Sequence, residues 1–176
     1  MKPEISTAAS VDPVRTPGKT LLMLAVMSVV ISVFLGLCHA LGTTDYWAAF
    51  LFILYWGMFE HTDFRKLPDC IVGALVGVLA SYLMQALPQL MGPSGGLVFL
   101  GVVLVLIFGQ LMGWLPVAIN AMTMLFLTVG TGSVLQAHTN FGSVLIALML
   151  GIMYFCGLIS LGKFIKQRVT TTNFYE

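Results

Sequence analysis

The sequence predicts an all-α membrane protein with six transmembrane helices, a short second helix and a candidate 3+3 inverted-topology repeat. Hydrophobic residues make up 59% of its 176 positions and charged residues only 9%, and the mean hydropathy is +0.99. A chain of this composition is not a water-soluble domain. The net charge is only +1, and no basic run suggests a nucleic-acid partner. The expected surroundings are therefore a lipid bilayer.

Apolar runs separated by polar turns define the helices. Residues 1–18 carry prolines and hydroxyl side chains without an apolar run, so we expect a flexible cytoplasmic tail and not a signal peptide. Residues 19–167 form the predicted transmembrane domain, and residues 168–176 form a cytoplasmic C-terminal tail. The predicted helices cover residues 20–41, 46–60, 68–91, 96–112, 117–136 and 141–165.

The first two helices differ in length and in aromatic content. Residues 20–41 are long enough to cross a hydrocarbon layer of about 30 Å. Residues 46–60 are shorter than a normal span and include Tyr55, Trp56 and Phe59. Tryptophan and tyrosine commonly anchor helix ends at the membrane interface. The alternative is that these three aromatic side chains line a substrate path.

The third and sixth helices carry strips of small residues. Pro68 suits the first turn of the third helix, and small residues then recur at every fourth position. Such a strip lets a neighbouring helix approach closely, and it indicates packing within one subunit or between copies. The strips consist of Gly73, Gly77 and Ser81 in the third helix and of Ser143, Ala147 and Gly151 in the sixth.

The fifth helix is the most polar of the six. Asn120, Thr123 and Thr131 fall near one face at 100° per residue, and Gln110 precedes them in the fourth helix. Uncharged amide and hydroxyl groups can replace water around a small neutral solute in a narrow path. The same groups also serve as hydrogen bonds between helices. The sequence leaves both interpretations open.

Charge placement supports six spans. With six helices, every Lys and Arg falls on the side that holds both termini and the turn after the second helix, so the positive-inside rule makes that side cytoplasmic. The eight basic residues are Lys2, Arg15, Lys19, Arg65, Lys66, Lys163, Lys166 and Arg168.

A short motif occurs twice. Residues 61–64 read His-Thr-Asp-Phe and residues 138–141 read His-Thr-Asn-Phe, 77 positions later. If three helices form one unit, the second unit must face the opposite side of the membrane, and the predicted topology places the two motifs on opposite sides. Inverted repeats are common in transporters. A short match in an apolar chain can also arise by coincidence.

Several apolar motifs occur in a characteristic order. They are Leu41-Gly42, Trp47-Ala48-Ala49-Phe50, Tyr55, and a second half from Gly101 to Leu148 and Gly151. Over most of residues 25–162 the chain thereby resembles the domain-of-unknown-function 1097 (YcdZ-like) family of small bacterial inner-membrane proteins. The resemblance implies a bacterial inner-membrane location and a permeation protein, without a named activity. Residues 60–63 depart from the glycine-rich turn of that family.

Ionisable residues between apolar runs are candidates for proton or gating groups. Glu60 and His61 follow the second helix, and His138 lies in the repeated motif. Because histidine titrates near neutral pH, Glu60 and His61 can form a proton-responsive mouth. The alternative is an interfacial loop whose acids and bases pair.

The sequence contains no motif for enzymatic chemistry or metal binding. Its three cysteines are far apart, and neither a phosphate-binding loop nor a dinucleotide fingerprint is present. We therefore expect no enzyme, cofactor or metal. The predicted function is a channel or facilitator for a small neutral or weakly acidic solute, assembled as a homo-oligomer. The alternatives are a proton-coupled transporter that uses Glu60 and His61, and a non-transporting membrane partner or assembly protein.

Overall fold

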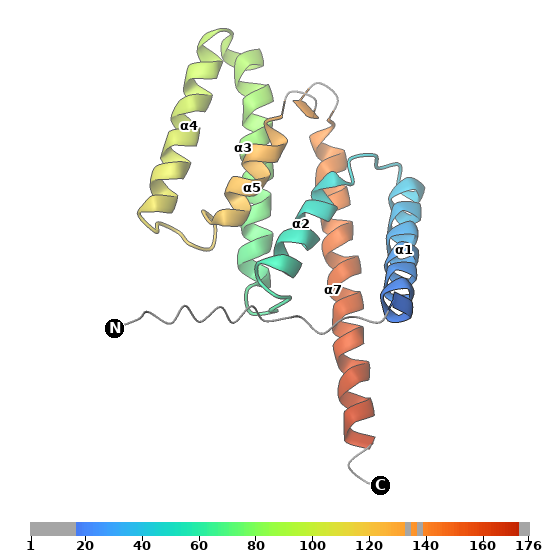
Figure 1. The fold of residues 1–176 in the computed structure, drawn as a ribbon. Helices are drawn as coiled ribbons and strands as arrows, with labels where there is room; N and C mark the ends of the chain where they lie inside the picture. The colour runs from blue at the N-terminus through green and yellow to red at the C-terminus, as the bar shows by residue number, and fades with distance from the viewer. Residues whose placement is uncertain (1–16, 133–134, 137–138, 173–176) are drawn as a thin grey trace, which may run out of the picture.

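A computed structural model describes residues 17–132, 135–136 and 139–172, with the backbone alone for Lys19 and residues 166–172. The described residues form six helices and no strand (Figure 1). Residues 1–16, His138 and residues 173–176 lie outside them, whereas residues 168–172 of the predicted C-terminal tail are helical. The helices are α1 (Pro17–Ala40), α2 (Trp47–Met58), α3 (Leu67–Met91), α4 (Ser94–Leu111), α5 (Ala121–Gly130) and α7 (Phe141–Thr172).

Four helices are long and apolar enough to cross a membrane, which indicates a membrane protein. At a rise of about 1.5 Å per residue, the 12 residues of α2 and the 10 residues of α5 fall short of a hydrocarbon layer of about 30 Å. The all-helical class is thus confirmed, with four helices of spanning length where six spans are predicted. The four candidate spans are Thr20–Ala40, Leu67–Met91, Ser94–Leu111 and Phe141–Ile165.

The fifth helix differs most from the prediction. It covers Ala121–Gly130, whereas the sequence predicts residues 117–136. Asn120 has an extended backbone (φ −136°, ψ −178°), and its side chain accepts a hydrogen bond from the Thr123 amide at 3.2 Å. A residue that caps a helix in this way stands before its first turn. Asn120 and Thr131 therefore lie at the two ends of a short helix, and not within a longer one.

The two short helices pair with long helices from the other half of the chain. In Figure 1, α1, α3 and α5 run upward, and α2, α4 and α7 run downward. α2 packs along α7, and α5 packs along α3. Each short helix thus lies beside a long helix that runs in the same direction. α1 contacts α7, and α4 lies against α3.

Small residues permit both pairings. A β-carbon added to Gly77 would lie 2.7 Å from the Thr123 carbonyl oxygen of α5, and one added to Gly151 would lie 3.1 Å from the Cα of Ala49 in α2. Each glycine also has a neighbouring Cβ atom, of Phe126 or Ala49, closer than real β-carbons approach, so a larger residue requires movement of one of the two helices. The predicted small strips on α3 and α7 therefore pack against helices of the same chain.

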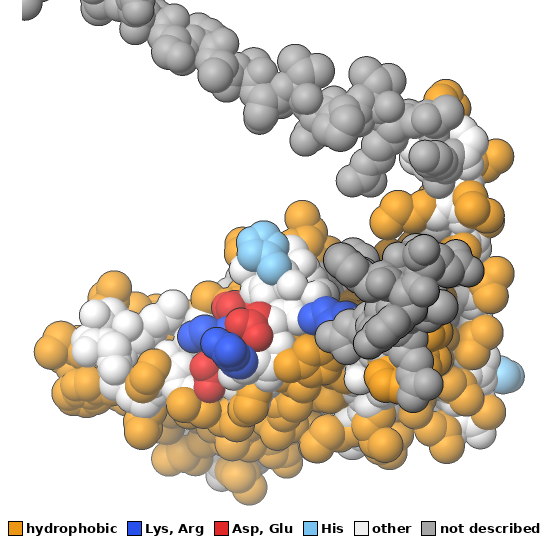
Figure 2. All heavy atoms as spheres, turned by 90° about the horizontal axis from the view of Figure 1, so that it is seen from below, with side chains coloured by type: hydrophobic (Ala, Val, Ile, Leu, Met, Phe, Trp, Pro, Cys, Tyr) orange, Lys and Arg blue, Asp and Glu red, His pale blue; other side chains and the backbone are white. Residues whose placement is uncertain are grey.

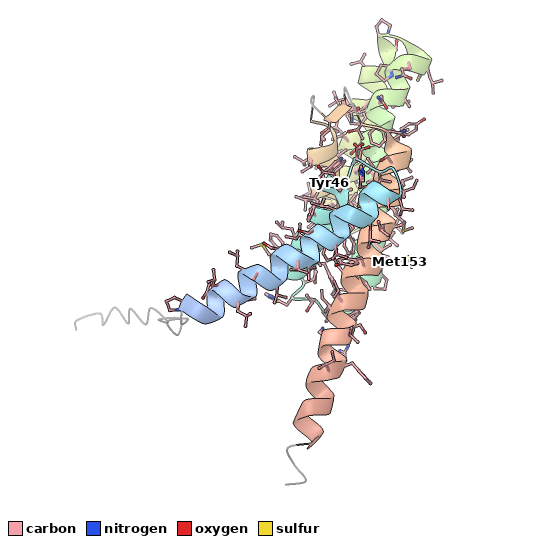
Figure 3. The ribbon with its side chains drawn as sticks, turned by 90° about the vertical axis from the view of Figure 1, so that its right-hand side faces the viewer. Tyr46 and Met153 are labelled. Atoms are coloured by element: carbon pink, nitrogen blue, oxygen red, sulfur yellow. The ribbon has the colours of Figure 1, made fainter. Side chains whose placement is uncertain are left out.

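The core lies among α2, α3, α5 and α7, while α1 and α4 are peripheral. The largest buried side chains of the core are Phe52, Trp56, Met122, Phe126, Val144 and Leu148. α1 is held near its middle, where the Tyr154 hydroxyl donates to the Val30 carbonyl at 2.9 Å. Below that contact α1 diverges from α7 (Figure 3). Large apolar side chains along α1 and α4, such as Leu22 and Leu104, are exposed, as lipid contact requires.

Candidate functional site: a polar hollow beside the turn between α2 and α3

Ionised side chains gather at one end of the molecule. Figure 2 shows this lower face, where Lys, Arg, Asp and Glu side chains occupy a small area bordered by apolar ones. The turn between α2 and α3, residues 59–66, supplies Glu60, Asp63, Arg65 and Lys66. This is the turn of the first His-Thr-Asp-Phe motif.

The turn has an unusual backbone. His61 (φ 48°) and Thr62 (φ 56°) both adopt the left-handed conformation, which costs a residue with a side chain roughly 1–2 kcal/mol. Two hydrogen bonds from opposite directions fix it: the Thr62 amide donates to the Trp56 carbonyl, and the Trp56 indole Nε1 donates to the Asp63 carbonyl, both at 3.0 Å. Trp56, near the C-terminal end of α2, therefore stabilises this strained backbone.

The C-terminal half of α7 fixes the same turn from the other side. Lys163 Nζ donates to the Thr62 carbonyl at 2.8 Å and lies 4.6 Å from the centroid of the Phe64 ring. Phe64 in turn makes an edge contact with Trp56, with ring centroids 5.2 Å apart. The chain therefore reverses direction at a defined position under α2.

A hollow of about 120 Å³ lies beside this turn. Polar side chains supply much of its lining, whereas the hollows between α3 and α7 and among α1, α2 and α7 have almost entirely apolar linings. The lining residues come from α2, the turn, the start of α3 and the segment before α5. They are Tyr55, Glu60, Lys66, Asp69, Cys70, Pro116 and Asn120.

Most polar groups around the hollow already have partners. Lys66 and Asp69 form an ion pair at 3.9 Å. Asn120 Nδ2 donates to the Asp69 carbonyl at 2.9 Å, and Asn120 Oδ1 accepts from the Thr123 amide. These bonds join the start of α5 to the first turn of α3. They also use the polar atoms of the Asn120 side chain.

Two groups remain available. Tyr55 is only 9% exposed, and its ring stacks on Phe59 at 5.1 Å. Within the described part of the chain, neither the Tyr55 hydroxyl nor the Glu60 carboxylate has a hydrogen-bond or ion-pair partner. The Glu60 carboxylate interacts electrostatically with that hydroxyl. Both groups border the hollow, where a ligand can reach them.

The structure brings together three of the predicted site residues, Tyr55, Glu60 and Asn120, at this hollow. Trp56 is fully buried behind the turn, and Phe59 is 66% exposed. His61 is exposed and does not line the hollow. His138, a predicted proton or gating residue, lies outside the described residues.

The remaining predicted residues lie away from the hollow. Thr123 is fully buried, and its hydroxyl donates to the Ala118 carbonyl at 2.7 Å. The Thr131 hydroxyl donates to the Leu127 carbonyl at 2.8 Å. Gln110 is partly buried on α4, and its Oε1 has no hydrogen-bond partner in the described structure. Both threonine hydroxyls therefore bond to backbone carbonyls of their own segment.

Lys66, Asp69 and Cys70 are site residues that the sequence reasoning missed. They stand at positions i, i+3 and i+4 around the start of α3, which places them on one helix face. That spacing was the available signal. Pro116 gives no comparable signal, because only the packing of the segment before α5 brings it to the hollow.

A second polar cluster joins α3 to the segment after α5. The Gln136 side chain donates to the Ser81 carbonyl at 3.1 Å, and the Gln85 side chain donates to the Gln136 carbonyl at 3.3 Å. The Ser81 hydroxyl also donates to the Phe126 carbonyl at 3.1 Å. These side chains bond to backbone groups across the contact between α3 and the α5 region, so they help to hold the two together.

Comparison with known proteins adds no relative. No family model, no curated protein and no solved structure matches the chain. The resemblance to the domain-of-unknown-function 1097 family therefore stays a prediction. Among the described residues, no three His, Cys, Asp or Glu side chains are grouped so as to hold a metal ion.

Proposed function

We propose that this chain is a membrane permeation protein, a channel or facilitator for a small neutral or weakly acidic solute. The observation that carries the proposal is that the two halves of the chain make the same helix pairings with opposite helix directions. Exchanging α1 with α4, α2 with α5 and α3 with α7 leaves the main helix pairings unchanged, since α2 on α7 becomes α5 on α3. The members of each exchanged pair run in opposite directions (Figure 1).

The spacing of the helices along the chain supports an inverted repeat. Ser94 of α4 follows Pro17 of α1 by 77 residues, which is also the spacing of the two histidine motifs. α5 and α7 begin 74 residues after α2 and α3. Inverted repeats recur in permeation proteins because they produce similar surfaces toward both sides of the membrane.

Location and assembly belong to the same proposal. The start of α1, the end of α7 and the turn between α2 and α3 lie toward the same side (Figure 1). The basic side chains that the structure describes, Arg65, Lys66 and Lys163, belong to that turn and to the C-terminal half of α7. The positive-inside rule makes this side cytoplasmic, in a bacterial inner membrane. Four core helices leave little room for a path within one chain, and the exposed apolar faces of α1 and α4 suit contacts in a homo-oligomer.

The test is solute flux into proteoliposomes, followed by stopped-flow light scattering. The solutes are urea, short amides, glycerol and short carboxylic acids, each at two pH values, and protein-free liposomes give the background. We expect a saturable rise in rate for one solute class. Background rates for every solute, with folded protein in the liposomes, would contradict permeation.

A proton-coupled transporter is the alternative that Glu60 favours, because its carboxylate borders the hollow without an ion-pair partner among the described side chains. His61 is exposed and does not border it. In a coupled carrier, Glu60→Gln together with His61→Asn abolishes pH-dependent flux. In a facilitator the variant keeps passive flux. Asp45→Asn, which removes an acid from the turn between α1 and α2, is the matched control.

A non-transporting partner or assembly protein is the second candidate. The hydrogen bonds of Asn120, Thr123 and Thr131 favour it, because these side chains bond to backbone groups of the protein. Purification of a stable complex with another membrane protein, together with background flux, would move the assignment to this candidate.

A further inference from the structure

We propose that the hollow beside the turn between α2 and α3 binds a small neutral amide, which donates N–H groups to the Glu60 carboxylate and accepts a hydrogen bond from the Tyr55 hydroxyl. The inference rests on the proposed function, and it names the class of solute that binds in this hollow.

The size of the hollow limits the ligand. Its volume is about 120 Å³, and one water molecule takes up about 30 Å³ in the liquid. The hollow therefore suits a solute of about four heavy atoms. Amides of the size of acetamide or urea have this number of atoms.

The two available groups specify the chemistry. The Tyr55 side chain is nine-tenths buried, and its hydroxyl lines the hollow with a proton to donate. The Glu60 carboxylate accepts hydrogen bonds only. An amide supplies a carbonyl oxygen for the first and N–H groups for the second. Lys66 is already paired with Asp69, and Asn120 bonds to backbone groups, so neither competes for the ligand.

The charges of the lining exclude anions. Glu60 and Asp69 contribute two carboxylates against the single ammonium of Lys66, so an ionised carboxylic acid is repelled at short range. A small cation suits Glu60, but it carries no acceptor for the hydroxyl proton of Tyr55. A neutral amide is the class that pairs with both groups.

The experiment compares three isosteric probes by saturation-transfer difference NMR on the full chain in detergent micelles. The probes are acetamide, acetate and acetamidinium, each of which has a methyl group that reports binding. We expect acetamide to bind most tightly and acetate not to bind. Tighter binding of acetamidinium than of acetamide would overturn the inference in favour of a cation site, and background signals for all three would overturn it outright.

Variants locate the site. Tyr55→Phe keeps the ring that stacks on Phe59 and removes only the hydroxyl, so acetamide affinity should fall about threefold to tenfold, as for one neutral hydrogen bond. Tyr82→Phe, on the outward half of α3, is the matched control and should leave affinity unchanged. Equal affinity in Tyr55→Phe and the wild type would contradict the assignment.

Glu60→Gln provides a second test, in which the measured quantity is the ratio of acetate affinity to acetamide affinity. It keeps a carbonyl acceptor and removes the charge, so acetate should gain affinity relative to acetamide. An unchanged ratio would contradict the role of Glu60. If solutes permeate but acetamide does not bind, the proposed function holds and the amide site is wrong. If acetamide binds but no solute permeates, the site holds and the proposed function is wrong.

Discussion

The residues that shape the turn between α2 and α3 show how a strained backbone is held. His61 and Thr62 have left-handed conformations without being glycine, and their cost is offset by bonds from Trp56 and Lys163. The sequence marks these positions as unusual only through their ionisable neighbours. Their conformation follows from three-dimensional contacts with α7, which lies about 100 residues away along the chain.

Trp56→Phe should destabilise the protein by about 1–3 kcal/mol, because it leaves the Asp63 carbonyl unpaired and a gap beside Phe64. The measurement is unfolding by sodium dodecyl sulfate in mixed micelles, followed by circular dichroism. Trp114→Phe is the matched control, because Trp114 is 55% exposed, and it should change stability little. Equal effects of the two substitutions would contradict the anchoring role of Trp56.

Asn120→Ala should cost about 1–2 kcal/mol, as expected for loss of a helix cap together with its bond to the Asp69 carbonyl. The same unfolding measurement checks it, with the exposed Thr128→Ala in the same helix as control.

Asn120 also shows where sequence reasoning stops. Its polarity suggests a path, but its extended backbone and its bonds to α3 make it a cap.

At the scale of elements, the lengths of the apolar runs predict α1, α3, α4 and α7 well, because a spanning helix requires a long apolar run. They predict α5 poorly, since residues 117–119 are apolar although the helix begins only at Ala121. The small strips predict close helix approaches but not their partners. The hollow could not be predicted, because it forms only where the segment before α5 meets α3.

Gly77→Leu should separate α3 from α5 and destabilise the protein by about 2 kcal/mol or more, as for an overpacked interior. Gly151→Leu should have a similar effect on the pairing of α7 with α2, since Ala49 of α2 packs closely against Gly151. Gly101→Leu is the control, because a β-carbon there meets open space. Wild-type stability of Gly77→Leu in the unfolding assay would contradict the close approach of α3 and α5.

At the scale of the whole molecule, the account depends on two halves that face opposite sides of the membrane. The equivalent positions Asp63 and Asn140 stand 77 residues apart in the two histidine motifs, and both side chains are exposed. An inverted repeat requires these two side chains to be exposed on opposite sides of the membrane. Because α3, α4 and α5 separate the two turns, the turns face opposite sides only if the chain crosses the membrane an odd number of times between them.

The most direct measurement is therefore labelling of Asp63→Cys and Asn140→Cys, made one at a time, with a membrane-impermeant maleimide in right-side-out membrane vesicles. The wild-type chain gives the background, because its cysteines are buried or partly buried. The account predicts that Asn140→Cys is labelled in intact vesicles and that Asp63→Cys is labelled only after the vesicles are opened. Labelling of both variants from the same side would contradict the inverted arrangement.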